Sequence, residues 1–144
     1  MDTIYHSEDL GKPFLLKLKS ELKNTFKGCK EIAIKIHFGE PGNDFAFKPE
    51  QIKPITNLLN ELNIGFFFYD SSVAYGGIRG DSESYKKYAA EKGWEDIGKI
   101  RIDEGFVVVK GKKMSYEVCK PLTEAEGVLV QLLLYIFYEP FLHV

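Results

Sequence analysis

The sequence predicts a single α/β domain over residues 1–144, with a mixed, mainly parallel sheet, about three helices and a C-terminal hairpin. Amphipathic helical stretches alternate with short β-branched or aromatic runs along the chain. One strand–helix–strand succession over about 40 residues is typical of a βαβ unit, whose crossover is expected to be right-handed. A length of 144 residues corresponds to one domain that can bury a sizeable core without disulfides.

The first predicted helix spans residues 12–27, and the first predicted strand spans residues 31–37. The helix carries apolar side chains every four residues, which gives it one apolar face. Pro13 suits its first turn and Gly28 the position just past its end. The strand is rich in β-branched residues, and a loop with several breakers follows over residues 38–47.

A second helix is predicted over residues 49–62 and a second strand over residues 65–69. Pro54 lacks an amide proton, so we expect either an irregular first turn or a helix that starts near Ile52. The strand contains four consecutive aromatic residues, a run that favours burial. A polar, glycine-rich loop follows it directly, as expected of a buried strand that delivers a loop at its carboxyl end.

The C-terminal half is predicted to begin with a helix capped by Asp81 or Ser82 and closed by Gly93. A short strand follows over residues 99–102, and residues 106–110 and 114–118 flank a turn as a hairpin. Residues 121–126 are predicted to form a turn. Residues 128–138 are almost all apolar, and they are interpreted either as a central strand or as another buried segment.

The apolar C-terminal segment carries a prediction about assembly. Eleven apolar residues are too few to cross a bilayer, so no membrane partner is expected. A tail this apolar needs cover, and we expect a homo-oligomer in which it lies at a subunit interface. The candidate interface residues are Leu133, Tyr135, Phe137 and Phe141.

Composition excludes several classes of protein. The net charge is −2 and the lysines do not cluster, which argues against nucleic acid as a partner. Cys29 and Cys119 form no CxxC pair, so no iron–sulfur cluster is expected from this chain alone. Residues 1–10 are polar and acidic rather than a signal peptide, and we expect a cytoplasmic protein.

The first group of candidate site residues follows the first predicted strand: His37, Glu40, Asn43 and Asp44. Pockets of parallel α/β sheets lie at the carboxyl ends of strands, so His37 should share one rim with Asp70. A histidine and a carboxylate there could perform acid–base chemistry or bind a metal. The alternative is a half-buried histidine bonded to a loop carbonyl.

The second group follows the second predicted strand and contains Asp70, Ser71, Ser72, Tyr75 and Arg79. Arg79 offers a planar guanidinium suited to a carboxylate or a phosphate. Asp70 is either a ligand or metal contact or an acceptor that ties the loop. The ligand-binding candidates are therefore His37, Glu40, Asn43, Asp70, Tyr75 and Arg79, with His37 and Asp70 also candidate metal ligands.

Several short motifs occur in one order, in residues 34–40, 48–50, 69–70, 75–79 and 89–94. In this order and with these gaps they resemble the uncharacterised domain-of-unknown-function 362 family, over roughly residues 31–126. The resemblance implies an α/β fold and a redox- or metal-linked role, and many longer members carry a ferredoxin-like module. It implies no established reaction.

The chain departs from that family pattern in three ways. It lacks the cluster cysteines, it has Tyr85 where a histidine is common, and an apolar tail replaces a histidine-bearing glycine segment after residue 130. We interpret it as a truncated or frameshifted N-terminal half whose tail is stabilised by burial. The missing half, encoded just downstream in another frame, would support this interpretation.

Two functional hypotheses follow, and the cofactor stays unknown in both. In the first, the chain is a small-ligand or metal-binding domain, with or without enzymatic activity, whose site lies at the carboxyl ends of the parallel strands. In the second, it is a globular or oligomeric module without catalysis of its own, and we favour this one for the chain by itself. A pocket that brings His37 and Asp70 within reach of each other would favour the first.

Overall fold

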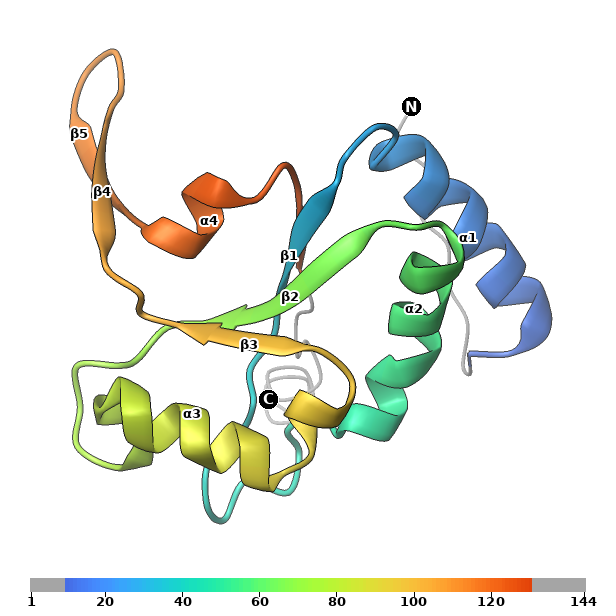
Figure 1. Cartoon of the computed structure of the whole chain (residues 1–144). Coiled ribbons are helices and arrows are strands. Elements are labelled where there is room, and N and C mark those ends of the chain that lie inside the picture. The colour runs from blue at the N-terminus through green and yellow to red at the C-terminus, as the bar shows by residue number, and fades with distance from the viewer. Residues whose placement is uncertain (1–9, 131–144) are drawn as a thin grey trace, which may run out of the picture.

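The computed structural model describes residues 10–130 and shows a parallel sheet covered by helices, together with a separate hairpin (Figure 1). The main sheet has the strand order β3-β2-β1-β6, and all of its pairings are parallel. The strands are β1 (Glu31–Lys35), β2 (Gly65–Asp70), β3 (Lys99–Ile102), β4 (Phe106–Lys110), β5 (Ser115–Cys119) and β6 (Val128–Val130). The helices are α1 (Lys12–Thr25), α2 (Pro49–Glu61), α3 (Ser82–Glu91) and α4 (Lys120–Glu124). The predicted α/β class is confirmed.

The main core lies between the sheet and the helices α1, α2 and α3. Alternate residues of β1 point into it, and Trp94 is completely buried in it. The Trp94 ring meets Phe38 and Phe68 edge to face, at centroid distances of 5.5 and 5.2 Å. This aromatic core fixes α3 against the sheet, which matters because α3 carries a residue of the candidate site.

The opposite face of the sheet has a smaller apolar cluster. Ala33, Phe67 and Tyr69 are buried there, with Leu122 and Ala125 of the α4 region packed against them. The segment that the sequence analysis predicted to be a turn therefore contains a short helix. Pro121 suits its first turn because proline has no amide proton to lose at that position.

The second helix begins where the predicted range 49–62 placed it. It starts at Pro49 rather than at the alternative start near Ile52, and Pro54 lies inside it. Pro54 removes one backbone hydrogen bond from α2, because it has no amide proton to donate. Asp81 caps α3 as expected, accepting a hydrogen bond from the Ser84 amide at 2.8 Å.

The strand β6 begins the apolar C-terminal segment and lies at the edge of the described sheet, beside β1. The rest of that segment, including Leu133, Tyr135, Phe137 and Phe141, lies outside the described residues. Among the residues that are described, no helix is long and apolar enough to span a membrane.

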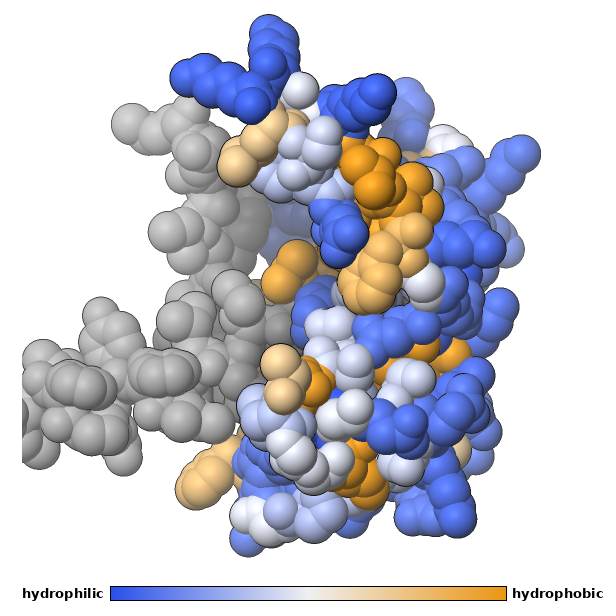
Figure 2. All heavy atoms as spheres, turned by 90° about the vertical axis from the view of Figure 1, so that its left-hand side faces the viewer, coloured by the Kyte–Doolittle hydropathy of each residue, from blue (hydrophilic) through white to orange (hydrophobic). Residues whose placement is uncertain are grey.

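The hairpin of β4 and β5 stands apart from the main sheet (Figure 1). Every residue of β4 is exposed, including four consecutive apolar residues. Figure 2, which faces the side of the molecule where the hairpin lies, shows apolar side chains gathered near the top of this face. The hairpin was predicted from its turn, but its exposure was not.

Candidate functional site

The two predicted strand ends lie side by side. The strands β1 and β2 are parallel neighbours with Lys35 opposite Tyr69, and the Ile36 amide continues the pairing by donating to the Tyr69 carbonyl at 3.0 Å. His37 follows at the end of β1, and Asp70 is the last residue of β2. Parallel pairing in this register brings both side chains to the same edge of the sheet.

Tyr85 of α3 joins these two residues. Its hydroxyl donates to Oδ2 of Asp70 at 2.6 Å and lies 3.3 Å from Nδ1 of His37. The same hydroxyl accepts the Phe38 amide at 3.1 Å. Burial, followed by the negative charge of Asp70, raises the pKa of the Tyr85 phenol, so it stays a neutral donor. His37 and Asp70 thus meet through a third side chain.

The Asp70 carboxylate is only 1% exposed and is surrounded by donors. Its Oδ1 accepts Nζ of Lys35 at 2.6 Å and the Ser71 amide at 2.9 Å. Its Oδ2 accepts the Tyr85 hydroxyl and lies 3.6 Å from Nη2 of Arg79. Both oxygens are therefore engaged by the protein, and Asp70 organises its neighbours rather than presenting free lone pairs.

The protonation of His37 follows from a backbone contact. The Gly39 amide donates to Nδ1 of His37 at 2.9 Å, so in the neutral ring the proton is on Nε2. Burial and the nearby Arg79 charge lower the pKa of His37, which favours this neutral form. Gly39 has φ +91°, and a Cβ there would lie 2.8 Å from that of Ala46. Only glycine allows this turn.

Arg79 faces the histidine with another donor. Its Nη1 lies 3.4 Å from Nε2 of His37 and donates to the Tyr75 hydroxyl at 3.1 Å. Since Nε2 of His37 carries a hydrogen, two donors point at each other across this short gap. Among the described residues, Nε of Arg79 is also a buried side-chain atom without a hydrogen-bond partner. An acceptor oxygen is the group that this arrangement lacks.

We call His37, Asp70, Arg79 and Tyr85, together with Lys35 and Tyr75, the strand-end cluster. Its innermost charges are two cations, Lys35 and Arg79, against one carboxylate. Glu40 also acts on His37, and its influence on the pKa is smaller than that of Asp70 but larger than that of Lys35. With Glu40 included, the two cations and two carboxylates balance, so the case for an anion depends on the donors of Arg79 and His37.

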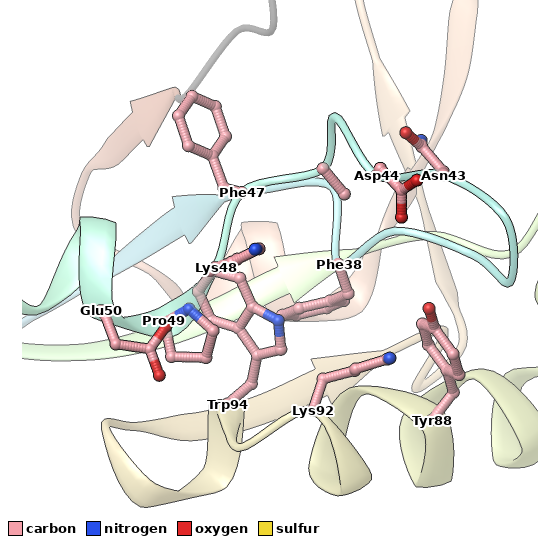
Figure 3. Close-up of a pocket in the computed structure, with 11 residues that line it drawn as sticks. Phe38, Asn43, Asp44, Phe47, Lys48, Pro49, Glu50, Tyr88, Lys92 and Trp94 are labelled. Atoms are coloured by element: carbon pink, nitrogen blue, oxygen red, sulfur yellow. The ribbon is translucent and has the colours of Figure 1, made fainter.

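Asn43 and Asp44 lie elsewhere, at a cavity of about 360 Å³ (Figure 3). This cavity is lined by side chains of the 38–50 segment and of the α3 end, among them Lys48, Tyr88 and Lys92. Asn43 has a local role as well, because its Oδ1 accepts the Phe45 amide at 3.0 Å. The six ligand-binding candidates thus divide between the strand-end cluster, the turn at Glu40, and this cavity.

The described residues contain no group of three or more His, Cys, Asp or Glu side chains arranged to hold a metal ion. At the pair proposed as metal ligands, Nδ1 of His37 and both oxygens of Asp70 already accept hydrogen bonds. A cation would also meet the charges of Lys35 and Arg79. The chemistry of this donor set therefore favours an anion over a metal.

Two members of the cluster, Tyr85 and Lys35, were not identified as site residues from the sequence. Tyr85 was not among the candidate site residues, because its contacts with Asp70 and His37 are tertiary. Lys35 stands at the end of a strand otherwise predicted from its apolar residues. Lys35 could have been found from the sequence. It is a charged residue at the end of one buried strand, and Asp70 at the end of the next strand is a carboxylate that can pair with it.

Comparison with known proteins adds no relative. No protein-family model matches the chain, and no curated protein or solved structure is significantly similar to it. The resemblance to the domain-of-unknown-function 362 family therefore stays a prediction from motif order.

Proposed function

We propose that this chain binds a small molecule through an anionic group, a carboxylate or a phosphate, at the carboxyl ends of β1 and β2. One observation carries the proposal. Nη1 of Arg79 and the protonated Nε2 of His37 are two donors 3.4 Å apart, and no hydrogen bond among the described residues uses the Nε2 hydrogen. An anionic oxygen that accepted from both would replace this unfavourable contact with two charge-assisted hydrogen bonds.

Arg79 is the primary contact in this proposal. Its guanidinium is largely buried, with its side chain 13% exposed, and it lies over the Tyr85 ring at 5.3 Å from the centroid. Burial and stacking hold the guanidinium in one orientation, so less side-chain entropy is lost when a ligand binds. Tyr75 is largely exposed and supplies a hydroxyl at the outer side of the site.

Asp70 and Tyr85 act as positioning residues. Asp70 attracts the guanidinium and the Lys35 ammonium, while Tyr85 ties that carboxylate to α3. Neither has a free group for the ligand. The proposed activity is binding, since the cluster has no ionisable side chain that is free to take up a proton from a ligand.

Thermal unfolding with inorganic phosphate, acetate and chloride at one ionic strength tests the proposal. A site-specific anion should raise Tm with the logarithm of its concentration, because it binds only the folded chain. Arg79→Gln should abolish the response. Lys87→Gln, which removes an exposed positive charge from the neighbouring helix α3, should retain the response. An equal response in the wild type and Arg79→Gln would refute a site at Arg79.

A further inference from the structure

The hairpin has an unusual distribution of side chains. The residues Phe106, Val107, Val108 and Val109 are 61%, 39%, 60% and 42% exposed. Neighbouring side chains of a strand point to opposite faces, so β4 exposes apolar residues on both. A continuous apolar run is typical of a strand that is covered on both faces, and an isolated two-stranded hairpin is only marginally stable in water.

The backbone of β4 also has a free edge. The Gly111 amide donates to the Met114 carbonyl, and the Lys120 amide donates to the Gly105 carbonyl. In the alternating pattern of an antiparallel pair, Val107 and Val109 then face β5. The amides and carbonyls of Phe106, Val108 and Lys110 point away from it. No other described strand pairs with β4, so these groups are available to a further strand.

From these observations we propose that β4 pairs with β4 of a second copy of this chain, in antiparallel orientation about Val108. The two hairpins would then form one four-stranded sheet across a two-fold axis. The residues whose backbone groups point away from β5 fit this register. Val108 lies opposite its own copy, and Phe106 lies opposite Lys110 of the second copy. Each such pair exchanges two backbone hydrogen bonds.

The charges at the two ends of β4 have a matching order, although Asp103 also accepts the Ser72 amide and Glu104 also pairs with Arg101 in its own chain. Asp103 and Glu104 precede Val108 by five and four residues, and Lys112 and Lys113 follow it by four and five residues. An antiparallel copy therefore brings the acidic end of one hairpin toward the basic tip of the other, twice. This self-complementary order of charges argues for a second copy rather than a partner of another kind.

The other edge of the hairpin does not fit a second copy. The outward-facing residues of β5 are Ser115, Glu117 and Cys119, because Glu117 lies opposite Val108. A two-fold pairing centred on β5 would place Glu117 against its own copy. Like charges directly opposite each other destabilise a pair of strands, so the proposal is specific for β4.

Sedimentation velocity of the full chain over a range of concentrations tests the proposal. We expect the wild type to form dimers that weaken as salt is added. Val108→Pro removes one outward amide from β4 and leaves the bonds to β5 intact, so it should leave monomers only. Glu117→Pro makes the same change at the free edge of β5 and should remain dimeric.

A second variant distinguishes loss of pairing from a folding defect caused by the proline. Val108→Lys places a cation against its own copy at an exposed position, so it should also abolish the dimer while its circular dichroism stays that of the wild type. A wild type that is monomeric at every concentration overturns the proposal. So does a dimer that survives Val108→Lys, an outcome that would point instead to an interface formed by another segment.

Discussion

The strand-end cluster and the hairpin depart from the usual distribution of side chains in opposite directions. In the cluster, a carboxylate that is 1% exposed is buried with cations and hydroxyl groups. In the hairpin, a run of apolar residues faces water. Ordinary surface and core positions say little about function, whereas buried polar groups and exposed apolar patches are informative. The cluster therefore suggests a ligand, and the hairpin suggests a partner chain.

The two regions should also differ in how substitutions affect folding stability and association. The cluster is joined to the core, because its residues come from β1, β2, α3 and the segment between β2 and α3. The hairpin contacts the body mainly through α4. Substitutions in the cluster should therefore change the stability of the whole domain, and substitutions in the hairpin should change association with little effect on folding.

The largest effect is expected for Asp70→Ala. The substitution leaves the Arg79 and Lys35 charges without their buried partner, and breaking a buried ion pair costs about 3–5 kcal/mol. Urea unfolding followed by circular dichroism would measure the loss. Asp44→Ala, at an exposed loop position, should change the free energy of unfolding by no more than about 0.5 kcal/mol. If both variants lose equally little, Asp70 does not organise the cluster.

Tyr85→Phe should have the next largest effect. It removes the hydroxyl that donates to Asp70 and accepts the Phe38 amide, and an unsatisfied buried group costs about 1–3 kcal/mol. The same urea experiment applies. Tyr88→Phe removes a hydroxyl from the same helix at a half-buried position and should cost about 0.5 kcal/mol or less. Equal losses in the two variants would contradict the role assigned to Tyr85.

His37 should make stability depend on pH. The fold lowers the pKa of His37 below its ordinary value of 6.5, so the unfolded chain binds a proton more readily. The contribution of neutral His37 is then fully present above pH 6.5 and is lost as the pH falls through 6.5 toward the folded pKa. The free energy of unfolding of His37→Gln should fall less steeply in that range. Profiles that stay parallel below pH 6.5 would argue against a shifted His37.

The smallest effect is expected in the hairpin. Val108→Ala, measured at concentrations where the chain is monomeric, should change the free energy of unfolding by about 0.5 kcal/mol or less, because Val108 is 60% exposed. Ile34→Val, at a 2% exposed position of β1, should cost about 0.5–1.5 kcal/mol although it removes a smaller group. A larger loss for Val108→Ala would mean that the hairpin contributes to the core.

The sequence was sufficient for those parts of the molecule that depend on local patterns. Helical periodicity located α1 and α2, and the aromatic run located β2. The rule that parallel strands share one edge brought His37 and Asp70 into one hypothesis. These inferences work because each depends on a repeat or a chain order that can be read within a short segment.

The remaining features depend on contacts between distant segments. Tyr85 was not a candidate site residue, because its partners in the cluster are 15 and 48 residues away in the sequence. The Gly39 amide that fixes the proton on His37 could not be foreseen, since it needs a positive φ and a close approach to Ala46. The exposure of β4 was also hidden, because an apolar run in a sequence normally indicates burial.

The position of β6 has a consequence for synthesis of the chain. This strand is the last one described, yet it pairs with β1, whose residues are made far earlier. At about 5–20 residues per second, a ribosome needs several seconds to pass from one to the other. During that interval the side of β1 that later pairs with β6 has no neighbour among the described strands. The four-strand order of the described sheet is therefore complete only after β6 has left the ribosome.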